Sequence, residues 1–393
     1  MSSDTVVIVA AKRTPIGAFL GTLSGATSTQ LGAAAIKGAI AASGIDGGDV
    51  DRVLMGCVLS AGLGQAPARQ AALGAGLPEG VPCVTVNKMC GSGLETIILA
   101  HDMIKAGSAS IVVAGGLESM SNAPYMLPKA RSGMRMGEQQ ALDHMFTDGL
   151  QDPYSGEMMG HFAQVTADEY GFSREEMDAY ATESALRAQR AVSDGSFADE
   201  IAPVTISSRH GDVTVTEDET PGLVSVDKIP KLRPAFRKDG TVTAATSSSI
   251  SDGAAAVVMM SEAEAKKRGV QPVAKIVAHS VFAQEPAWFT TAPVYALKKL
   301  HETLGWTPDD VDLYEINEAF AVVTMAALRD VGISHDKVNV NGGACALGHP
   351  IGATGCRISV TLLHALKARG LKRGIATQCI GGGEASAVAY EIL

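Results

Sequence analysis

The stretch Gly44-Ile45-Asp46-Gly47-Gly48-Asp49-Val50-Asp51 decides the fold, because the chain returns to its pattern 261 residues later as Gly305-Trp306-Thr307-Pro308-Asp309-Asp310-Val311-Asp312. Each copy leads directly into an apolar run, Val53–Leu59 in the first and Leu313–Ile316 in the second. A constant offset over several landmarks indicates an internal duplication. We therefore expect two halves with the same α/β plan, each with a sheet buried between helices.

The two copies stay in step on both sides of this stretch. A helical pattern precedes each copy, at residues 30–43 and 294–304. Each copy then continues into a Val-Asn pair, a Gly-rich turn, a helix and an apolar strand that we expect to end at glycines. These features are Val86-Asn87 and Val340-Asn341, followed by the strand Ile111–Ala114 before Gly115-Gly116 and the strand Gly374–Ile380 before Gly381-Gly382-Gly383.

Residues 120–250 have a different character from both halves. They contain Met-rich and Pro-rich turns, a helical pattern from Arg174 to Asp194 and a short β-like run, so we interpret them as an inserted loop domain. We predict an N-terminal half at residues 1–268, which includes this loop domain, and a C-terminal half at residues 269–393.

Composition excludes several classes of protein. With 393 residues, 46% hydrophobic and 19% charged, the chain is far from the signature of disorder. The net charge of −10, without an extended basic run, disfavours nucleic acid and anionic membranes as partners. No apolar stretch approaches membrane-spanning length, so we expect neither a signal peptide nor a membrane span. Six cysteines without a CxxC pair favour a reducing cytoplasm over a disulfide framework.

Cys90 is the first candidate for chemistry. It lies in the Gly-rich turn Asn87–Leu94, between an expected strand and a helix that we expect to begin at Leu94. Backbone N–H groups and the positive helix end would lower the pKa of a thiol there and favour the thiolate nucleophile. A buried, inert cysteine is the alternative, and this turn alone does not decide between them.

Three more candidates follow in the C-terminal half. His349 is held between a glycine and a proline, Cys379 precedes three glycines, and Asn317 ends an apolar strand. Taken singly, each has a structural explanation: a satisfied polar group, a buried thiol and a helix N-cap. Together with Cys90 they are expected at the carboxyl ends of strands, where α/β sheets place their sites, with one thiol as nucleophile and the other as acid/base.

Other uses of such residues are disfavoured by spacing. The cysteines and histidines lack the close ligand pairs of zinc motifs, so we expect no metal. The first strand is not followed by GxGxxG, and the chain has no GxxxxGK[ST] motif, which disfavours nucleotide-dependent redox chemistry and phosphoryl transfer.

The sequence resembles the thiolase family along essentially its whole length. The resemblance rests on four motifs in the family's order: Cys90-Gly-Ser, Asn317-Glu-Ala-Phe, Gly348-His-Pro and Cys379-Ile-Gly, with Lys231-Leu-Arg-Pro-Ala-Phe236 and Asp252-Gly-Ala-Ala-Ala between them. The chain looks most like the short-chain acetyl-CoA C-acetyltransferases. The resemblance implies a thiolase-like, duplicated five-layer αβαβα fold with an inserted loop domain.

The resemblance also implies a mechanism, a reversible Claisen condensation of two acetyl-CoA into acetoacetyl-CoA and coenzyme A. Cys90 would form an acetyl-enzyme with help from His349, and Cys379 would take a proton from the second acetyl-CoA. His349, with a water held by Asn317, would stabilise the enolate. The backbone N–H groups of Cys90 and Gly381 would stabilise the tetrahedral intermediate.

Coenzyme A is then substrate and product, and no further cofactor is expected. The family's motifs predict coenzyme A neighbours at Leu150, Met159, Phe236, Ala244, Ser248, Ala319 and Phe320, and an acyl-pocket position at Phe289. The family's tetramers predict a homotetramer, a dimer of dimers, joined by an arm at Ser121–Met145; a flap on its own subunit is the alternative. A broader-range 3-ketoacyl-CoA thiolase, a decarboxylating ketosynthase and a non-catalytic acyl-CoA-binding protein remain alternative functions.

Overall fold

The computed structural model describes residues 5–209 and 211–393 of the chain. Within them, ten strands form one mixed sheet in the order β12-β13-β14-β11-β1-β10-β5-β3-β4, with the short β2 (Gly17–Ala18) paired to β10. The strands of the first half are β1 (Val6–Arg13), β3 (Arg52–Gly56), β4 (Cys83–Val86), β5 (Ile111–Ser119) and β10 (Ser251–Ser261). Those of the second are β11 (Ala274–Ala283), β12 (Leu313–Ile316), β13 (Arg373–Ile380) and β14 (Glu384–Ile392).

The strand order confirms the duplication. In the first half, β1–β10 and β10–β5 are antiparallel while β5–β3 and β3–β4 are parallel. The second half repeats this with β11–β14 and β14–β13 antiparallel and β13–β12 parallel. The counterpart of β4 is reduced to one parallel bridge between Tyr314 and Val338. The halves join where Val7 and Ile8 of β1 pair with Lys275 and Ala274 of β11.

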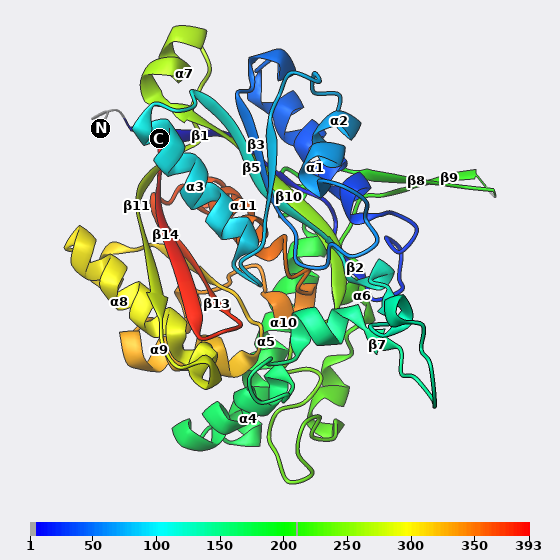
Figure 1. Ribbon diagram of the computed structural model, residues 1–393. Helices are drawn as coiled ribbons and strands as arrows, with labels where there is room; N and C mark the ends of the chain where they lie inside the picture. The colour runs from blue at the N-terminus through cyan, green and yellow to red at the C-terminus, as the bar shows by residue number, and fades with distance from the viewer. Residues whose placement is uncertain (1–4, 210) are drawn as a thin grey trace.

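Helices and sheet alternate in five layers (Figure 1). The outer face of the first half is covered by α1 (Ser28–Ser43) and α2 (Pro67–Gly74), and that of the second by α8 (Ala292–Leu304) and α9 (Ala321–Val331). Between the halves lie α3 (Ser92–Ala106) and α11 (Thr354–Ala368), whose apolar side chains form one core with residues of both sheet halves. The duplicated αβαβα arrangement is therefore present.

The first glycine of each copy of the repeated stretch ends the helix that precedes it. Helix α1 starts at a capping box between Thr27 and Gln30 and ends at Gly44, whose φ is 70°. Its counterpart α8 ends at Gly305, whose φ is 63°. Left-handed backbone of this kind favours glycine, so both copies stop their helix at the same place before turning into a central strand.

One predicted strand end is wrong. β5 does not stop before Gly115-Gly116 but runs through both glycines to Ser119. A Cβ at Gly116 would overlap the carbonyl oxygen of Gly352, and one at Gly115 would overlap that of Ala255. These glycines therefore allow close packing within the sheet and against the segment before α11, rather than a turn.

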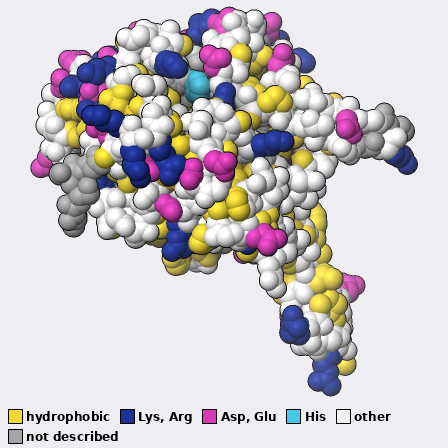
Figure 2. Space-filling view, turned by 90° about the horizontal axis from the view of Figure 1, so that it is seen from above, with side chains coloured by type: hydrophobic (Ala, Val, Ile, Leu, Met, Phe, Trp, Pro, Cys, Tyr) yellow, Lys and Arg dark blue, Asp and Glu magenta, His cyan; other side chains and the backbone are white. Residues whose placement is uncertain are grey.

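Between β5 and β10 the chain leaves the sheet and covers one end of it. This segment contains β6 (Tyr125–Met126), β7 (Leu142–Asp143), a π-helical turn η4 (Phe146–Leu150), α4 (Met159–Tyr170), α5 (Arg174–Ser193), β8 (Val204–Ser208), β9 (Gly211–Val215), α6 (Thr220–Leu223) and η5 (Val226–Lys231). The β8–β9 hairpin and the β6–β7 arm project from the body, as Figures 1 and 2 show. The remaining short helices are α7 (Glu262–Arg268) and α10 (Ala344–Leu347).

A buried ion pair ties this segment to the sheet. The fully buried guanidinium of Arg13 on β1 contacts Asp218 at 2.7 Å and Glu200 at 2.5 Å. Removing Arg13 would leave two buried carboxylates without their counter-charge. Among the described residues, no helix is both long and apolar enough to cross a membrane.

Candidate active site

A cavity of about 250 Å³ lies where the inserted segment meets both halves of the sheet. Of the residues predicted for the site, nine line it: Cys90, His349, Gly381, Leu150, Met159, Phe236, Ser248, Ala319 and Phe320. They come from both halves and from the inserted segment. The duplication and the insertion together therefore build one site.

Cys90 sits in the tight turn between β4 and α3. The residue before it, Met89, has a φ of 46°, and α3 begins two residues after it at Ser92. The backbone N–H groups of Gly381 and of Cys90 itself are directed at the Cys90 sulfur. These are the two N–H groups that the resemblance assigns to the tetrahedral intermediate.

The expected lowering of the Cys90 pKa is wrong in direction. Burial raises the pKa of this thiol to about 11, and the two backbone N–H groups only partly oppose that effect. The nearby buried carboxylate of Glu118 raises it further. Desolvation therefore outweighs the helix end, and Cys90 rests as a neutral thiol that needs a base to become a nucleophile.

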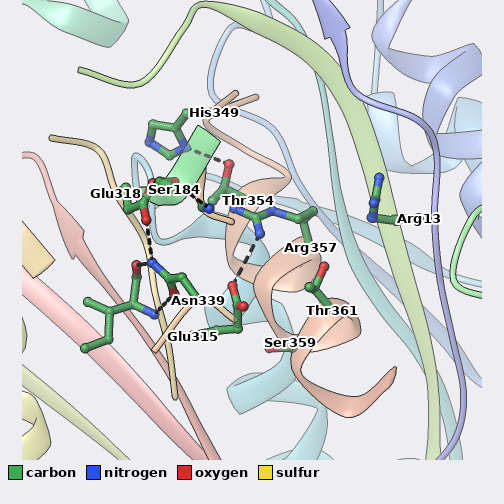
Figure 3. A network of polar contacts seen from close by, with 12 residues as sticks. Arg13, Ser184, Glu315, Glu318, Asn339, His349, Thr354, Arg357, Ser359 and Thr361 are labelled. Atoms are coloured by element: carbon green, nitrogen blue, oxygen red, sulfur yellow. Dashed lines mark hydrogen bonds and ion pairs between the residues drawn. The ribbon is translucent and has the colours of Figure 1, made fainter. Parts of the chain in front are cut away.

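His349 supplies a neutral imidazole to the cavity that Cys90 also lines. Burial, with the positive charge of Arg357, lowers its pKa to about 3. Its Nδ1 contacts the Thr354 hydroxyl at 2.6 Å (Figure 3), and that hydroxyl donates to the Pro350 carbonyl at 3.0 Å. Nδ1 is therefore the donor nitrogen, which leaves Nε2 as the acceptor. Within the described residues, the buried Nε2 has no hydrogen-bond partner.

His349 does not follow a strand, contrary to the expectation for all four candidates. It lies in the turn between α10 and α11, because the strand that would precede it in the second copy is reduced to the bridge at Val338. Gly348, with a φ of 109°, begins this turn, and the His349 N–H donates to the Ser249 carbonyl at 3.0 Å.

Cys379 and Asn317 are placed behind the cavity surface. Cys379 is the penultimate residue of β13 and is fully buried, and burial together with the nearby Cys90 raises the pKa of its thiol well above the usual value. Asn317 follows β12 and is not the N-cap of α9, which is Phe320. Neither side-chain amide atom of Asn317 bonds to another described residue.

Glu118 was missed from the sequence. This fully buried carboxylate accepts hydrogen bonds from the backbone N–H groups of Val58 at 3.0 Å, Leu59 at 3.1 Å and Gly352 at 2.9 Å. It thereby ties the segment after β3 to the turn that carries His349. Burial raises its pKa to about 7.

Glu318 anchors α5 to the end of β12 (Figure 3). Its carboxylate accepts from Tyr180 and Ser184 of α5, both at 2.8 Å, from Asn339 at 2.9 Å and from the Cys345 N–H at 3.0 Å. Every partner is buried, so this network fixes the strand end that carries the neighbouring Asn317.

Two predicted substrate neighbours lie off the cavity surface. Ala244 is exposed, and Phe289 is buried one layer behind, edge-on to Phe162 and to Phe320 with 6.5 Å between ring centroids in each pair. The cavity lining also includes residues without a sequence prediction: Met120, Phe146, Gly149, Met158, Gly160, Ser247, Ser249, Ile250 and Ile351. Five of them are sequence neighbours of predicted residues, which was the available signal: Gly149, Met158, Gly160, Ser247 and Ser249.

The arrangement suits acyl transfer. A neutral thiol and a neutral imidazole with a free acceptor nitrogen line one apolar cavity, and two backbone N–H groups converge where an oxyanion would form on the sulfur-bound carbon. A second thiol lies close behind.

Comparison with known proteins agrees with this geometry. The family model for the thiolase N-terminal domain matches residues 6–263 and that for the thiolase C-terminal domain matches residues 270–392. The chain belongs to the thiolase family. This thiolase is 48% identical to the acetyl-CoA acetyltransferase of Pseudomonas aeruginosa over 98% of both chains, and 46% identical to that of Schizosaccharomyces pombe over the full length of both.

Solved structures of similar proteins superpose closely on this thiolase. The crystal structure of the Bacillus anthracis acetyl-CoA acetyltransferase superposes with a TM-score of 0.97 at 41% identity, covering 99% of both chains. A thiolase from Ascaris suum in complex with coenzyme A superposes with a TM-score of 0.93 at 42% identity, covering 99% of this chain and all of that one.

Proposed function

We propose that this thiolase is an acetyl-CoA C-acetyltransferase, an acyltransferase that condenses two acetyl-CoA into acetoacetyl-CoA and coenzyme A and catalyses the reverse thiolysis. The observation that carries the proposal is the Cys90 thiol in one cavity with the unpaired Nε2 of His349 and the Gly381 N–H. Near-full-length identity of about 48% to proteins named acetyl-CoA acetyltransferase supports it.

The first half-reaction follows from the protonation states. His349 Nε2 takes the proton of Cys90 as its sulfur attacks the thioester carbonyl, and the backbone N–H groups hold the resulting oxyanion. The carbon–sulfur bond to coenzyme A then breaks. Because burial keeps Cys379 protonated, it is the thiol that gives the departing coenzyme A sulfur its proton.

The second half-reaction uses the groups that the first has prepared. Cys379, now a thiolate, removes a proton from the methyl group of the second acetyl-CoA. His349, with a water held by Asn317, stabilises the enolate, whose carbon attacks the acetyl group on Cys90. The Cys90 sulfur leaves and recovers its proton from His349, so every proton is returned.

The apolar cavity supports short acyl chains. Its volume of about 250 Å³ is shared by the acyl group and the end of the coenzyme A arm, and the buried Phe289–Phe320 pair backs it. We therefore favour acetoacetyl-CoA over longer 3-ketoacyl-CoA, with the broader-range thiolase as the alternative that a chain-length series of substrates tests.

The deciding experiment is thiolysis of acetoacetyl-CoA by coenzyme A, with mass spectrometry of the protein after mixing with acetyl-CoA. We expect turnover and one acetyl group on Cys90 in the wild type, and neither in Cys90→Ala. Cys83→Ala is the matched control, because Cys83 is a half-buried cysteine on the preceding strand that does not line the cavity. Folded wild type without turnover or adduct would favour a binding protein, and dependence on malonyl thioesters would favour a ketosynthase.

We further propose a homotetrameric, cytoplasmic enzyme. The β6–β7 arm supports the assembly, because Tyr125, Leu127 and Met136 expose apolar side chains on a projecting segment (Figure 2). Light scattering should give four chains, and Leu127→Asp with Met136→Asp should give two. Six cysteines without a disulfide support the compartment, which imaging of a tagged chain would test.

A further inference from the structure

A cluster of metal-ligating side chains lies outside the active site. His101 and Asp102, near the C-terminal end of α3, lie beside His279 of β11. Figure 1 labels this helix and this strand. The Asp102 carboxylate oxygen Oδ1 lies 2.8 Å from His101 Nδ1 and 3.1 Å from His279 Nε2. One ligand atom from each of the three residues falls within a common span of 4.8 Å.

The donor set suits a particular class of ion. Two imidazole nitrogens with one carboxylate oxygen are ligands of zinc and neighbouring divalent transition metals, whereas magnesium and calcium prefer oxygen alone. A tetrahedral zinc ion needs ligand atoms about 3.3 Å apart. The two carboxylate-to-nitrogen separations, 2.8 and 3.1 Å, are already close to this value. The two imidazole nitrogens lie within 4.8 Å of each other and must draw together as the ion binds.

The three side chains are both held in place by packing and reachable from solvent. The side chains of His101 and His279 are only 13% and 24% exposed, so packing holds the two rings, whose centroids are 5.2 Å apart at 84°. Asp102, at 57% exposed, opens the cluster to solvent.

We infer that His101, Asp102 and His279 form a binding site for one zinc ion, with solvent as the fourth ligand. Binding replaces the two imidazole–carboxylate hydrogen bonds with three bonds to the metal. The site joins residues 177 positions apart, one on each half of the duplicated fold, so the ion acts as a cross-link between α3 and β11. Since Cys90 lies just before α3, the cross-link fixes the far end of the helix that follows the nucleophile.

The test is equilibrium dialysis of the chelator-treated, full-length protein against zinc, with cobalt as a spectroscopic probe. We expect about one ion per chain, a visible cobalt spectrum of low-coordinate nitrogen and oxygen ligation, and a higher unfolding temperature with zinc. His279→Asn and Asp102→Asn should each weaken binding by about tenfold or more. Asp102→Asn changes an exposed side chain, so it reports on binding even where substitution of a histidine disturbs folding.

The matched control is His161→Asn. His161 is an exposed histidine whose nearest carboxylate, Glu157, lies 3.9 Å away, and it belongs to no three-ligand cluster among the described residues. This variant should bind zinc like the wild type. The inference is overturned by absence of stoichiometric binding, by binding that survives both cluster substitutions, or by a sulfur-to-cobalt charge-transfer band, which would place the ion on cysteines.

Discussion

Replacing Thr354 with valine tests how the His349 imidazole, the proposed base, is held. The Thr354 hydroxyl fixes the proton on His349 Nδ1 and leaves Nε2 as the base. Valine has nearly the same volume but no hydroxyl, so the Nδ1–H becomes a buried donor without a partner, at a cost of about 1–3 kcal/mol. The alternative tautomer, with the proton on Nε2, no longer carries this penalty at Nδ1, and in that form the ring cannot accept the Cys90 proton.

The expected loss of rate follows from that energy. A difference of about 1–3 kcal/mol corresponds to a factor of about 5 to 150, because each 1.36 kcal/mol is a tenfold change. Thiolysis of acetoacetyl-CoA measured over a range of substrate concentrations should therefore show kcat reduced by this factor while KM changes little. Acetylation of the protein by acetyl-CoA should slow by the same factor.

Thr354→Ser is the matched control, since it keeps the hydroxyl and should retain most of the activity. Thr303→Val removes a hydroxyl from an exposed part of α8, where it bonds only the Lys299 carbonyl, and should leave kcat unchanged. A Thr354→Val enzyme with kcat within about twofold of wild type would refute the assignment of the base nitrogen.

Three further changes test the site. Glu118→Gln should lower kcat, because an amide cannot accept all the N–H groups that the carboxylate accepts. The folded state also holds the Glu118 proton more tightly than the unfolded chain, where the pKa has its ordinary value of 4.5, so the stability that this proton provides is lost as the pH rises toward about 7. The wild type's advantage in unfolding temperature over Glu118→Gln should therefore shrink over that pH range. Alkylation of Cys90 by iodoacetamide should keep accelerating up to about pH 11 instead of levelling off near 9. Phe289→Leu should raise activity on longer 3-ketoacyl-CoA relative to acetoacetyl-CoA, because it replaces the aromatic ring behind the acyl pocket with a smaller side chain.

Each of these has its own control and contrary result. Glu157→Gln removes an exposed carboxylate and should change neither rate nor pH dependence. Alkylation of Cys90 that levels off near pH 9 or below would restore the helix end as the dominant influence. An unchanged ratio of activities in Phe289→Leu would mean that other residues set the chain length.

Local patterns predicted the fold because the decisive elements are local. The helix stops at Gly44 and Gly305 and the run Leu313–Ile316 are set by neighbouring residues, and the structure has them where the sequence placed them. The extent of β5 was not predictable in this way. Whether Gly116 ends a strand or permits close packing depends on Gly352, which the chain brings to it from 236 residues away.

The same division holds for the site. Gly-rich turns displayed Cys90, His349 and Cys379 as candidates, but their protonation states depend on burial created by both halves. Glu118 carried no signal because a glutamate in an apolar strand looks like an edge position until its backbone donors are known. His279 likewise becomes a ligand candidate only beside α3.

The two edges of the sheet differ, and this difference limits how copies of the chain can pair strand to strand. At the β4 end, the edge strand is complete and exposes Val84. At the β12 end, the strand is replaced by one bridge and by the Asn339 side chain, whose amide bonds both the N–H and the carbonyl of Ile316 at 2.9 Å. A sheet with one open edge pairs once about a twofold axis and then terminates, whereas two open edges would propagate a fibre. The Asn339 side chain thus occupies the two backbone groups of Ile316 that a further strand would need at this edge.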